Sequence, residues 1–380
     1  KIAAELIALP LPADAVEADN QQVMANIIGY YAGDSRFAFG YIDPWMGHSA
    51  FIINQINGPT IDMPGSMVNS HPINNEQDAK DYLARLALFG PALKSISDKF
   101  NTDVKSGWIP PRVLLDKAQN ILKNYGNSNA TEHPLYRDFA AKLDKVTTFT
   151  AEQKQPLLEQ AATHIGTVVA PGYQQLLADV VATLPHARSE AGIWAQPNGS
   201  DFYAYSVRQL GDTDLTPDQI HQIGLDEVAR IHAEMQAIMQ KTSFDGDLNA
   251  FFQFMQTDPQ FYYPDTAEGK AAYLADATAV IDHMRTRLDE LFLVKPKADM
   301  IVKAVEPFRE QTAGKAFYQQ PSMDGSRPGI YYANLYRMSD MPKYELEALA
   351  YHEGIPGHHM QLAIAQELTE MPKFRRFGGY

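Results

Sequence analysis

The feature that most constrains the fold of this chain is the helical spacing of its apolar residues. Long stretches place apolar side chains at positions i, i+3, i+4 and i+7, which lie on one face of an α-helix. The stretches cover residues 71–100, 110–126, 138–146, 150–184, 216–240 and 270–292. No fixed-period repeat is present, and no alternation of strands with helices that would build a parallel sheet. The sequence therefore predicts a mainly helical protein.

Helix starts and stops can be assigned for some of these stretches. Asn74 or Asn75 is a candidate cap for the helix that follows His71, and the Gly90-Pro91 pair is expected to break or kink that helix. Thr216 is expected to cap the helix that starts at Pro217, because proline is favoured at the first helical position.

Two segments depart from the helical pattern. Residues 41–67 hold three prolines and three glycines among β-branched and aromatic residues, which indicates an irregular loop with a short strand. Residues 321–336 give a Gly/Pro-rich loop followed by a short extended aromatic run, and residues 339–342 supply a helix start. We therefore expect a large multi-helix fold with a few short strands next to the helix that begins near residue 342.

Length and charge limit the classes of protein. A chain of 380 residues suits one large domain, here taken as residues 1–380, with a separate N-terminal lobe over residues 1–125 as an option within it. The 32 Lys and Arg residues against 46 Asp and Glu residues give a net charge of −14, which would repel a nucleic acid or an anionic lipid surface. No apolar run approaches the roughly 18 to 20 residues of a membrane-spanning helix, so we expect no transmembrane segment in this chain.

Cysteine is absent, so any metal ion must be held by histidine and carboxylate side chains. The chain begins with Lys1, and its opening residues lack the apolar core of a signal peptide, which indicates a processed or cut piece of something longer. An exported, periplasmic protein, lipid-anchored before processing, is one interpretation of this start. A cytoplasmic protein is the other.

One string, HEGIPGHHMQ, gathers three of the eleven histidines: His352, His358 and His359. In the zinc-peptidase motif HExxH, two histidines one helical turn apart bind the metal and the glutamate between them polarises water. Here Glu353 stands at the glutamate position, but position 356 is proline. His352 and His358 are six residues apart, which on a regular helix means about 120° around the axis and roughly 9 Å along it.

The same string also supplies a way to deform the helix. Pro356 has no N–H for the carbonyl of His352, and the glycines at 354 and 357 allow unusual backbone angles. Looping out two residues would bring His358 to the second histidine position of HExxH, with His359 as the alternative. The other interpretation is an ordinary helix end whose histidines are solvated or act as caps.

At this point the chain resembles a known family. HEGIPGHHMQ is similar to the HExxPGHxxQ signature of the bacterial family called domain of unknown function 885, whose members are regarded as zinc-metallopeptidase-like proteins with a largely helical fold. Further segments resemble family blocks: HPINNEQDAKDYLARL, GWIPPRVLLDK, LTPDQIHQIGLDEVARI and RPGIYYANL. The resemblance implies zinc as cofactor, His352 and His358 as ligands, Glu353 as base and a peptide as substrate. Gln361 falls on the last signature position.

One part of the family pattern is missing. The resemblance implies a third, glutamate ligand on a helix well beyond the signature, whereas Tyr380 lies only 22 residues after His358 (380 − 358 = 22). Glu367 and Glu370 are the carboxylates of this tail, and both lie too near the signature helix to fold back easily. We therefore expect a chain that stops inside its domain, with an incomplete metal site.

The first functional hypothesis is a zinc-dependent peptidase in which Glu353 acts as general base on a metal-activated water. Two alternatives stay open. One is a non-catalytic helical binding protein whose metal site is lost or incomplete. The other is a metal-dependent hydrolase that acts on non-peptide amides or esters.

The extended run from Gly329 to Asn334 offers a surface for the peptide. We expect it to be a short edge strand near the metal helix, to which a peptide adds as a further strand. Strand alternation places Tyr331 and Tyr332 on opposite faces, so one of these two tyrosines is the candidate to stabilise the reaction intermediate. The alternative is a buried aromatic strand that packs the core.

Overall fold

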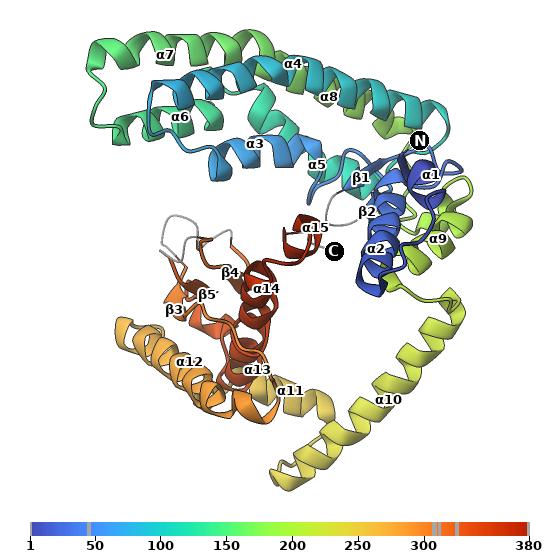
Figure 1. Cartoon of the computed structure of the whole chain (residues 1–380), viewed down its shortest axis with the longest axis vertical. Helices are drawn as coiled ribbons and strands as arrows, with labels where there is room; N and C mark the ends of the chain where they lie inside the picture. The colour runs from blue at the N-terminus through green and yellow to red at the C-terminus, as the bar shows by residue number, and fades with distance from the viewer. Residues whose placement is uncertain (1, 44–46, 306–309, 311–312, 324–326, 378–380) are drawn as a thin grey trace. The chain divides into compact units, whose positions relative to one another are not determined.

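The computed structural model describes the chain except residues 1, 44–46, 306–309, 311–312, 324–326 and 378–380. It is mainly helical, as predicted, and divides into two compact units, Lys1–His221 and Gln222–Tyr380 (Figure 1). The division lies at residue 221 and not near residue 125, where the sequence had offered a lobe boundary. Within the described residues, no helix combines the length and the apolar character needed to cross a bilayer.

The first unit is a helical assembly with two very short strands. Its main core lies between α3 and α8, where apolar faces of successive helices meet. Its elements are α1 (Ile2–Ile7), α2 (Ala15–Ala32), β1 (Tyr41–Asp43), β2 (Gly47–Ser49), α3 (Pro59–Ser70), α4 (Glu76–Lys105), α5 (Arg112–Gly126), α6 (Pro134–Lys145), α7 (Ala151–His164), α8 (Ala170–Thr183) and α9 (Gly199–Gly211). The segment 41–67 thus holds a small hairpin and the start of a helix, where the sequence had suggested a loop with one strand.

Helix α4 corrects one prediction and confirms another. Asn75 is its cap, accepting a hydrogen bond from the backbone N–H of Asp78 at 3.0 Å. The helix then runs without interruption past Pro91, so of the break or kink expected there the break is absent. Proline removes one backbone hydrogen bond, at a cost of about 3 kcal/mol. Buried residues on both sides of it, such as Phe89 and Leu93, each contribute roughly 1.5–3 kcal/mol on burial and so hold the helix together.

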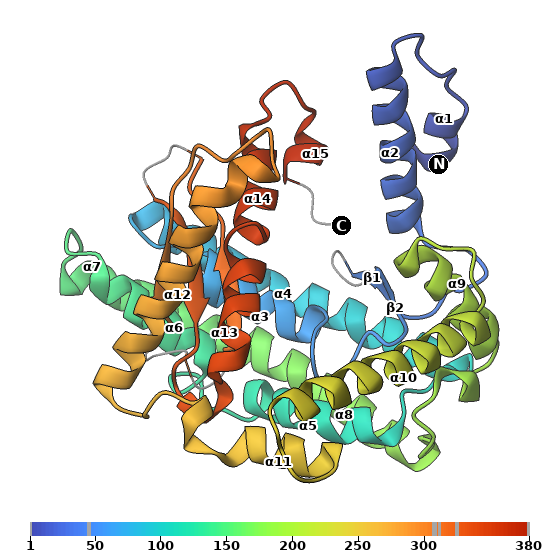
Figure 2. The same ribbon diagram turned by 90° about the horizontal axis from the view of Figure 1, so that it is seen from below.

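The second unit contains the histidine segment. It takes in most of α10 (Pro217–Lys241), which Thr216 caps as predicted, followed by further helices and a small sheet (Figure 2). The remaining elements are α11 (Leu248–Thr257), α12 (Ala267–Arg287), β3 (Met300–Ala304), β4 (Ala316–Gln319), β5 (Gly329–Ala333), α13 (Lys343–Glu353), α14 (His358–Glu367) and α15 (Lys373–Phe377).

Strand β5 lies in the middle of the sheet, whose order is β3-β5-β4. It pairs in parallel with β3 and antiparallel with β4, so the prediction that it is an edge strand was wrong. The flanking strands β3 and β4 carry too few apolar residues in alternation to be recognised from the sequence. Every residue of β5 is buried, and α12 and α13 cover the face that carries Tyr331.

Candidate metal centre

The helix that carries the histidines is interrupted where the sequence predicted. Helix α13 ends at Glu353 and α14 begins at His358, with a cis peptide bond between Ile355 and Pro356 in the turn. Gly357 makes this turn possible because a Cβ atom there would lie 1.9 Å from the carbonyl oxygen of His352. Four residues, 354–357, therefore separate the two helices.

The interruption brings the imidazoles of His352 and His358 together. Their ring centres are 4.9 Å apart and the rings are nearly perpendicular, at 82°. Two imidazoles bound to one tetrahedral zinc by bonds of about 2.1 Å have ring centres roughly 5 Å apart. The spacing of this pair therefore fits two ligands of one metal ion.

Gln361 fixes which nitrogen of His358 is free. The Nδ1 of His358 lies 3.0 Å from Oε1 of Gln361, one turn further along α14. An amide oxygen can only accept, so Nδ1 carries the proton and Nε2 keeps its lone pair. Histidine ligands of metals usually make this kind of hydrogen bond with their second nitrogen. The last position of the signature thus gains a physical role that the sequence could not supply.

His359, the alternative ligand, is excluded by its hydrogen bonds. Its side chain is fully buried, with Nδ1 2.8 Å from the hydroxyl of Tyr318 and Nε2 3.0 Å from the carbonyl oxygen of Ala298. Both ring nitrogens are therefore occupied, and burial lowers the pKa of this imidazole. The structure favours His358 over His359 as the partner of His352.

Glu353 is the last residue of α13 and lies beside the histidine pair. Its side chain is only 7% exposed, and burial raises the pKa of the carboxyl, while His358 and His352 act in the opposite direction. A carboxylate with a raised pKa in a partly closed site has the properties of a general base that works near neutral pH.

The two candidate tyrosines of β5, Tyr331 and Tyr332, lie on opposite faces of the sheet. Tyr331 is fully buried on the face toward α13, where its hydroxyl lies 3.4 Å from that of Tyr273. Burial raises the pKa of its phenol, and Tyr273 and Glu353 add to the shift. Tyr332 lies on the opposite face and stacks on Phe317 with ring centres 4.9 Å apart. The structure therefore brings Tyr331, and not Tyr332, to the side of the metal centre.

Among the described residues, no third ligand lies near the pair. In the part of the chain that the structure describes, no three His, Cys, Asp or Glu side chains are grouped so that they could hold a metal ion. The carboxylate of Glu367 accepts hydrogen bonds from the backbone N–H groups of Lys297 (2.7 Å) and Ala298 (3.2 Å), so this residue holds a loop. Glu370 is exposed to solvent. The described residues thus bring together two candidate ligands, His352 and His358, and the carboxyl group of Glu353.

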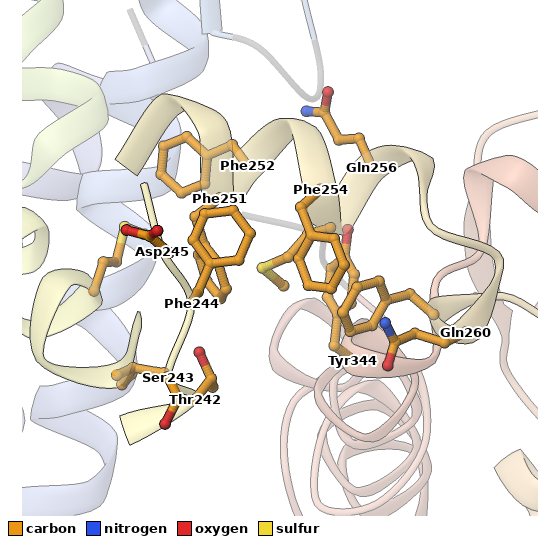
Figure 3. Close-up of a pocket in the computed structure, with 14 residues that line it drawn as sticks. Thr242, Ser243, Phe244, Asp245, Phe251, Phe252, Phe254, Gln256, Gln260 and Tyr344 are labelled. Carbon is orange, nitrogen blue, oxygen red and sulfur yellow. The ribbon is translucent and has the colours of Figure 1, made fainter. Parts of the chain in front are cut away.

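A separate apolar pocket of about 790 Å³ lies in the same unit (Figure 3). Aromatic rings of Phe244, Phe251, Phe254 and Phe261 line it, with Tyr344 contributed by the first turn of α13. His352, Glu353 and His358 are not among the lining residues. The pocket is therefore distinct from the metal centre.

The residues that sequence reasoning missed are Tyr318 and Ala298. Tyr318 lies on β4 and Ala298 just before β3, and both contact the metal helix through His359. Neither lies in a motif, so only the folded sheet reveals their role. The signal for Gln361 was present, since it occupies a fixed position in the signature.

Comparisons with known proteins place the chain among bacterial proteins. The model of the family described as bacterial protein of unknown function (DUF885) matches residues 2–380. The chain is also similar to a protein whose crystal structure is described as that of "the putative lipoprotein from Colwellia psychrerythraea", with 40% sequence identity and a TM-score of 0.90. That match covers 100% of this chain and 65% of the other, so the chain spans about 65% of the length of this solved relative. No curated protein matches the chain.

Proposed function

The chain belongs to the DUF885 family of bacterial proteins, and from this premise we propose that it carries the core of a zinc-dependent peptidase site. The observation that carries the proposal is the pair of imidazoles, 4.9 Å apart across the interrupted helix, with the buried carboxyl of Glu353 beside them. His352 and His358 would hold the metal ion. Catalytic zinc sites have three protein ligands, so the proposal includes a third ligand outside the described residues.

Each residue of the site has a defined task in this proposal. Zinc, when bound, would supply Lewis acidity toward a carbonyl group and lower the pKa of water. Glu353 takes the proton from the attacking water and passes it to the leaving amine, which its raised pKa favours. Gln361 holds His358 in the tautomer whose Nε2 is free.

The edge of the sheet supports a peptide as the substrate. The backbone N–H of Asn334 donates to the carbonyl of Lys315 at 3.0 Å, so alternation turns the backbone groups of Ala316 and Tyr318 away from β5. Within the described residues, β4 is an edge strand of this sheet. Tyr318 also lies beside the histidines, with its ring centre 6.5 Å from that of His358. A peptide that adds to β4 as a strand would therefore run next to the metal centre.

We further propose that the protein is exported. The support is its 40% identity to a protein described as a lipoprotein, since lipoproteins are exported before they are anchored. Cell fractionation with an antibody against the chain would test this, and recovery in the cytoplasmic fraction alone would contradict it.

Zinc binding to the metal-stripped natural full-length protein tests the first half of the proposal. Isothermal titration should give one zinc per chain, and both His352→Ala and His358→Ala should abolish this stoichiometric binding. His232→Ala is the matched control because His232 is exposed on α10, and it should bind zinc like the wild type. Full zinc occupancy in His358→Ala would contradict the ligand assignment.

Turnover of the natural full-length protein tests the second half. Digestion of a peptide library should be lost in Glu353→Gln, while zinc content stays at one per chain. Zinc binding without cleavage of any peptide or ester would favour a non-catalytic binding protein. Cleavage of ester or non-peptide amide probes alone would favour a hydrolase of another substrate class.

A further inference from the structure

His359 is buried directly beside the proposed ligand His358, yet it faces away from the metal pair. The two residues follow each other in the first turn of α14, so their side chains leave the helix in different directions. The imidazole of His359 spans two other elements, reaching the hydroxyl of Tyr318 on β4 at 2.8 Å and the carbonyl oxygen of Ala298 at 3.0 Å. The first turn of α14 is therefore tied to the sheet through a single ring.

The two partners define the protonation of this ring. A carbonyl oxygen only accepts, so Nε2 of His359 donates to Ala298, and in the neutral ring Nδ1 accepts from the hydroxyl of Tyr318. Histidine is suited to this place because it donates at one end of a rigid ring and accepts at the other.

The backbone at Gly329 lies directly against the hydrogen bond between His359 and Tyr318. Gly329, the first residue of β5, lies against both partners: a Cβ atom there would be 2.3 Å from the Tyr318 hydroxyl and 2.7 Å from Nδ1 of His359. Any side chain at this position would push the tyrosine and the histidine apart. The glycine thus leaves room for one specific hydrogen bond.

Tyr318 also lies beside the proposed ligand His358. Its ring lies nearly parallel to that of His358, at 23° and with ring centres 6.5 Å apart, while its hydroxyl is held by His359. Displacement of Tyr318 would therefore affect both histidines. Since Tyr318 lies on the edge strand β4, the same side chain connects that strand to the ligand helix.

We propose that His359, Tyr318 and the carbonyl of Ala298 form an anchor that positions His358 for the metal ion. His359 and Tyr318 are positioning residues, and His359 is not a ligand. The inference rests on the proposed zinc site for its functional meaning, and it adds that the site's affinity depends on β4. Binding of a peptide to β4 would then change the position of the His358 ring.

Tyr318→Phe tests the anchor because it removes one hydroxyl and keeps the ring. Zinc affinity measured by titration should fall about 10- to 100-fold, the usual effect of losing a group that orients a ligand. Tyr173→Phe is the matched control, since Tyr173 is fully buried and donates to the carbonyl of Thr60 at 2.8 Å in the other unit. It should lower thermal stability and leave zinc affinity unchanged.

A second measurement works without metal. Selective labelling of histidine gives the nuclear Overhauser contact between the rings of His352 and His358 in the metal-free protein. This contact should weaken in Tyr318→Phe and in Gly329→Ala, and stay intact in Tyr173→Phe. Unchanged ring contact together with unchanged zinc affinity in Tyr318→Phe would overturn the anchor. Failure of the wild type to bind zinc would overturn the proposed function instead, and the ring contact would still decide the anchor.

Discussion

At the scale of single residues, Gln361 and His358 form the contact that most directly prepares a nitrogen for a metal. The Oε1 of Gln361 lies 3.0 Å from Nδ1 of His358. Without it the ring would exchange between tautomers, and half-buried His358 would reorient toward solvent more freely. The side chain therefore acts on the metal through the ring of another residue.

We expect Gln361→Ala to weaken zinc binding about 10- to 100-fold, because the Nδ1–H of His358 loses its acceptor. Gln361→Glu keeps an acceptor at the same reach and should restore most of the affinity. Zinc titration measures both, and ¹⁵N spectra of His358 should show the proton on Nδ1 in the wild type. Equal affinity of all three proteins would show that Gln361 has no part in the site.

The buried carboxyl of Glu353 predicts a pH dependence of stability in the metal-free protein. Its pKa is raised above the ordinary value of 4.5, because burial removes the charged carboxylate from water. The folded state therefore holds the proton more tightly than the unfolded state. As far as this group is concerned, stability is greatest below about pH 4.5 and falls as the pH rises through the raised pKa.

Glu353→Gln removes this titration. The free energy of unfolding of the variant, relative to the wild type, should increase as the pH rises from about 4.5 and level off above the raised pKa. Urea titrations of metal-free protein at a series of pH values measure it. A difference that does not change with pH would mean that Glu353 is solvated as an ordinary carboxylate.

At the scale of elements, the interruption between α13 and α14 decides whether the two histidines meet. On a regular helix they would point about 120° apart, whereas the turn at residues 354–357 brings their rings to 4.9 Å. Gly357 is the tightest point of this turn, since a Cβ atom would lie 1.9 Å from the His352 carbonyl and 2.3 Å from that of Tyr351.

We expect Gly357→Ala to open the turn and separate the histidines. Zinc affinity should fall by about a hundredfold or more, since moving a ligand costs at least as much as losing its orienting partner. Stability should fall by about 1–3 kcal/mol because the backbone must shift. Gly224→Ala, on α10 with no atom within 4 Å of the new Cβ, is the control and should gain up to about 1 kcal/mol. A Gly357→Ala protein that binds zinc normally would refute the geometric role of the turn.

At the scale of the whole molecule, α10 stands out because none of its residues is buried. It begins at Pro217, close to the division between the two units at residue 221. Helices without a buried face depend on their own hydrogen bonds and open locally at low free-energy cost.

Limited trypsin digestion should therefore cut first after Arg230, giving fragments 1–230 and 231–380. Lys94 on α4 is the internal comparison, because its side chain is more exposed than that of Arg230 but lies on a helix with a buried face. Mass spectrometry of early time points should show cleavage at Arg230 at least about tenfold faster than at Lys94. Comparable rates would indicate that α10 is held as firmly as the core helices.

The sequence by itself determined the helical class, the capped helix starts at Asn75 and Thr216, and the interruption around Pro356. These follow from interactions between residues near each other in the chain, which local spacing reports directly. It could not decide between His358 and His359, or assign Gln361. That choice depends on which histidine forms hydrogen bonds with Tyr318 and Ala298. These residues lie 41 and 61 positions away from His359 in the chain.

The tertiary structure also decided the place of β5 and the continuity of α4. Whether a strand is central or at an edge depends on the strands that pair with it. The two partners of β5, β3 and β4, are difficult to recognise from the spacing of their apolar residues. A proline breaks a helix unless packing on both sides outweighs the lost hydrogen bond, and at Pro91 the buried face of α4 does so. In both cases the deciding energy comes from contacts between segments distant in sequence, which local spacing cannot report.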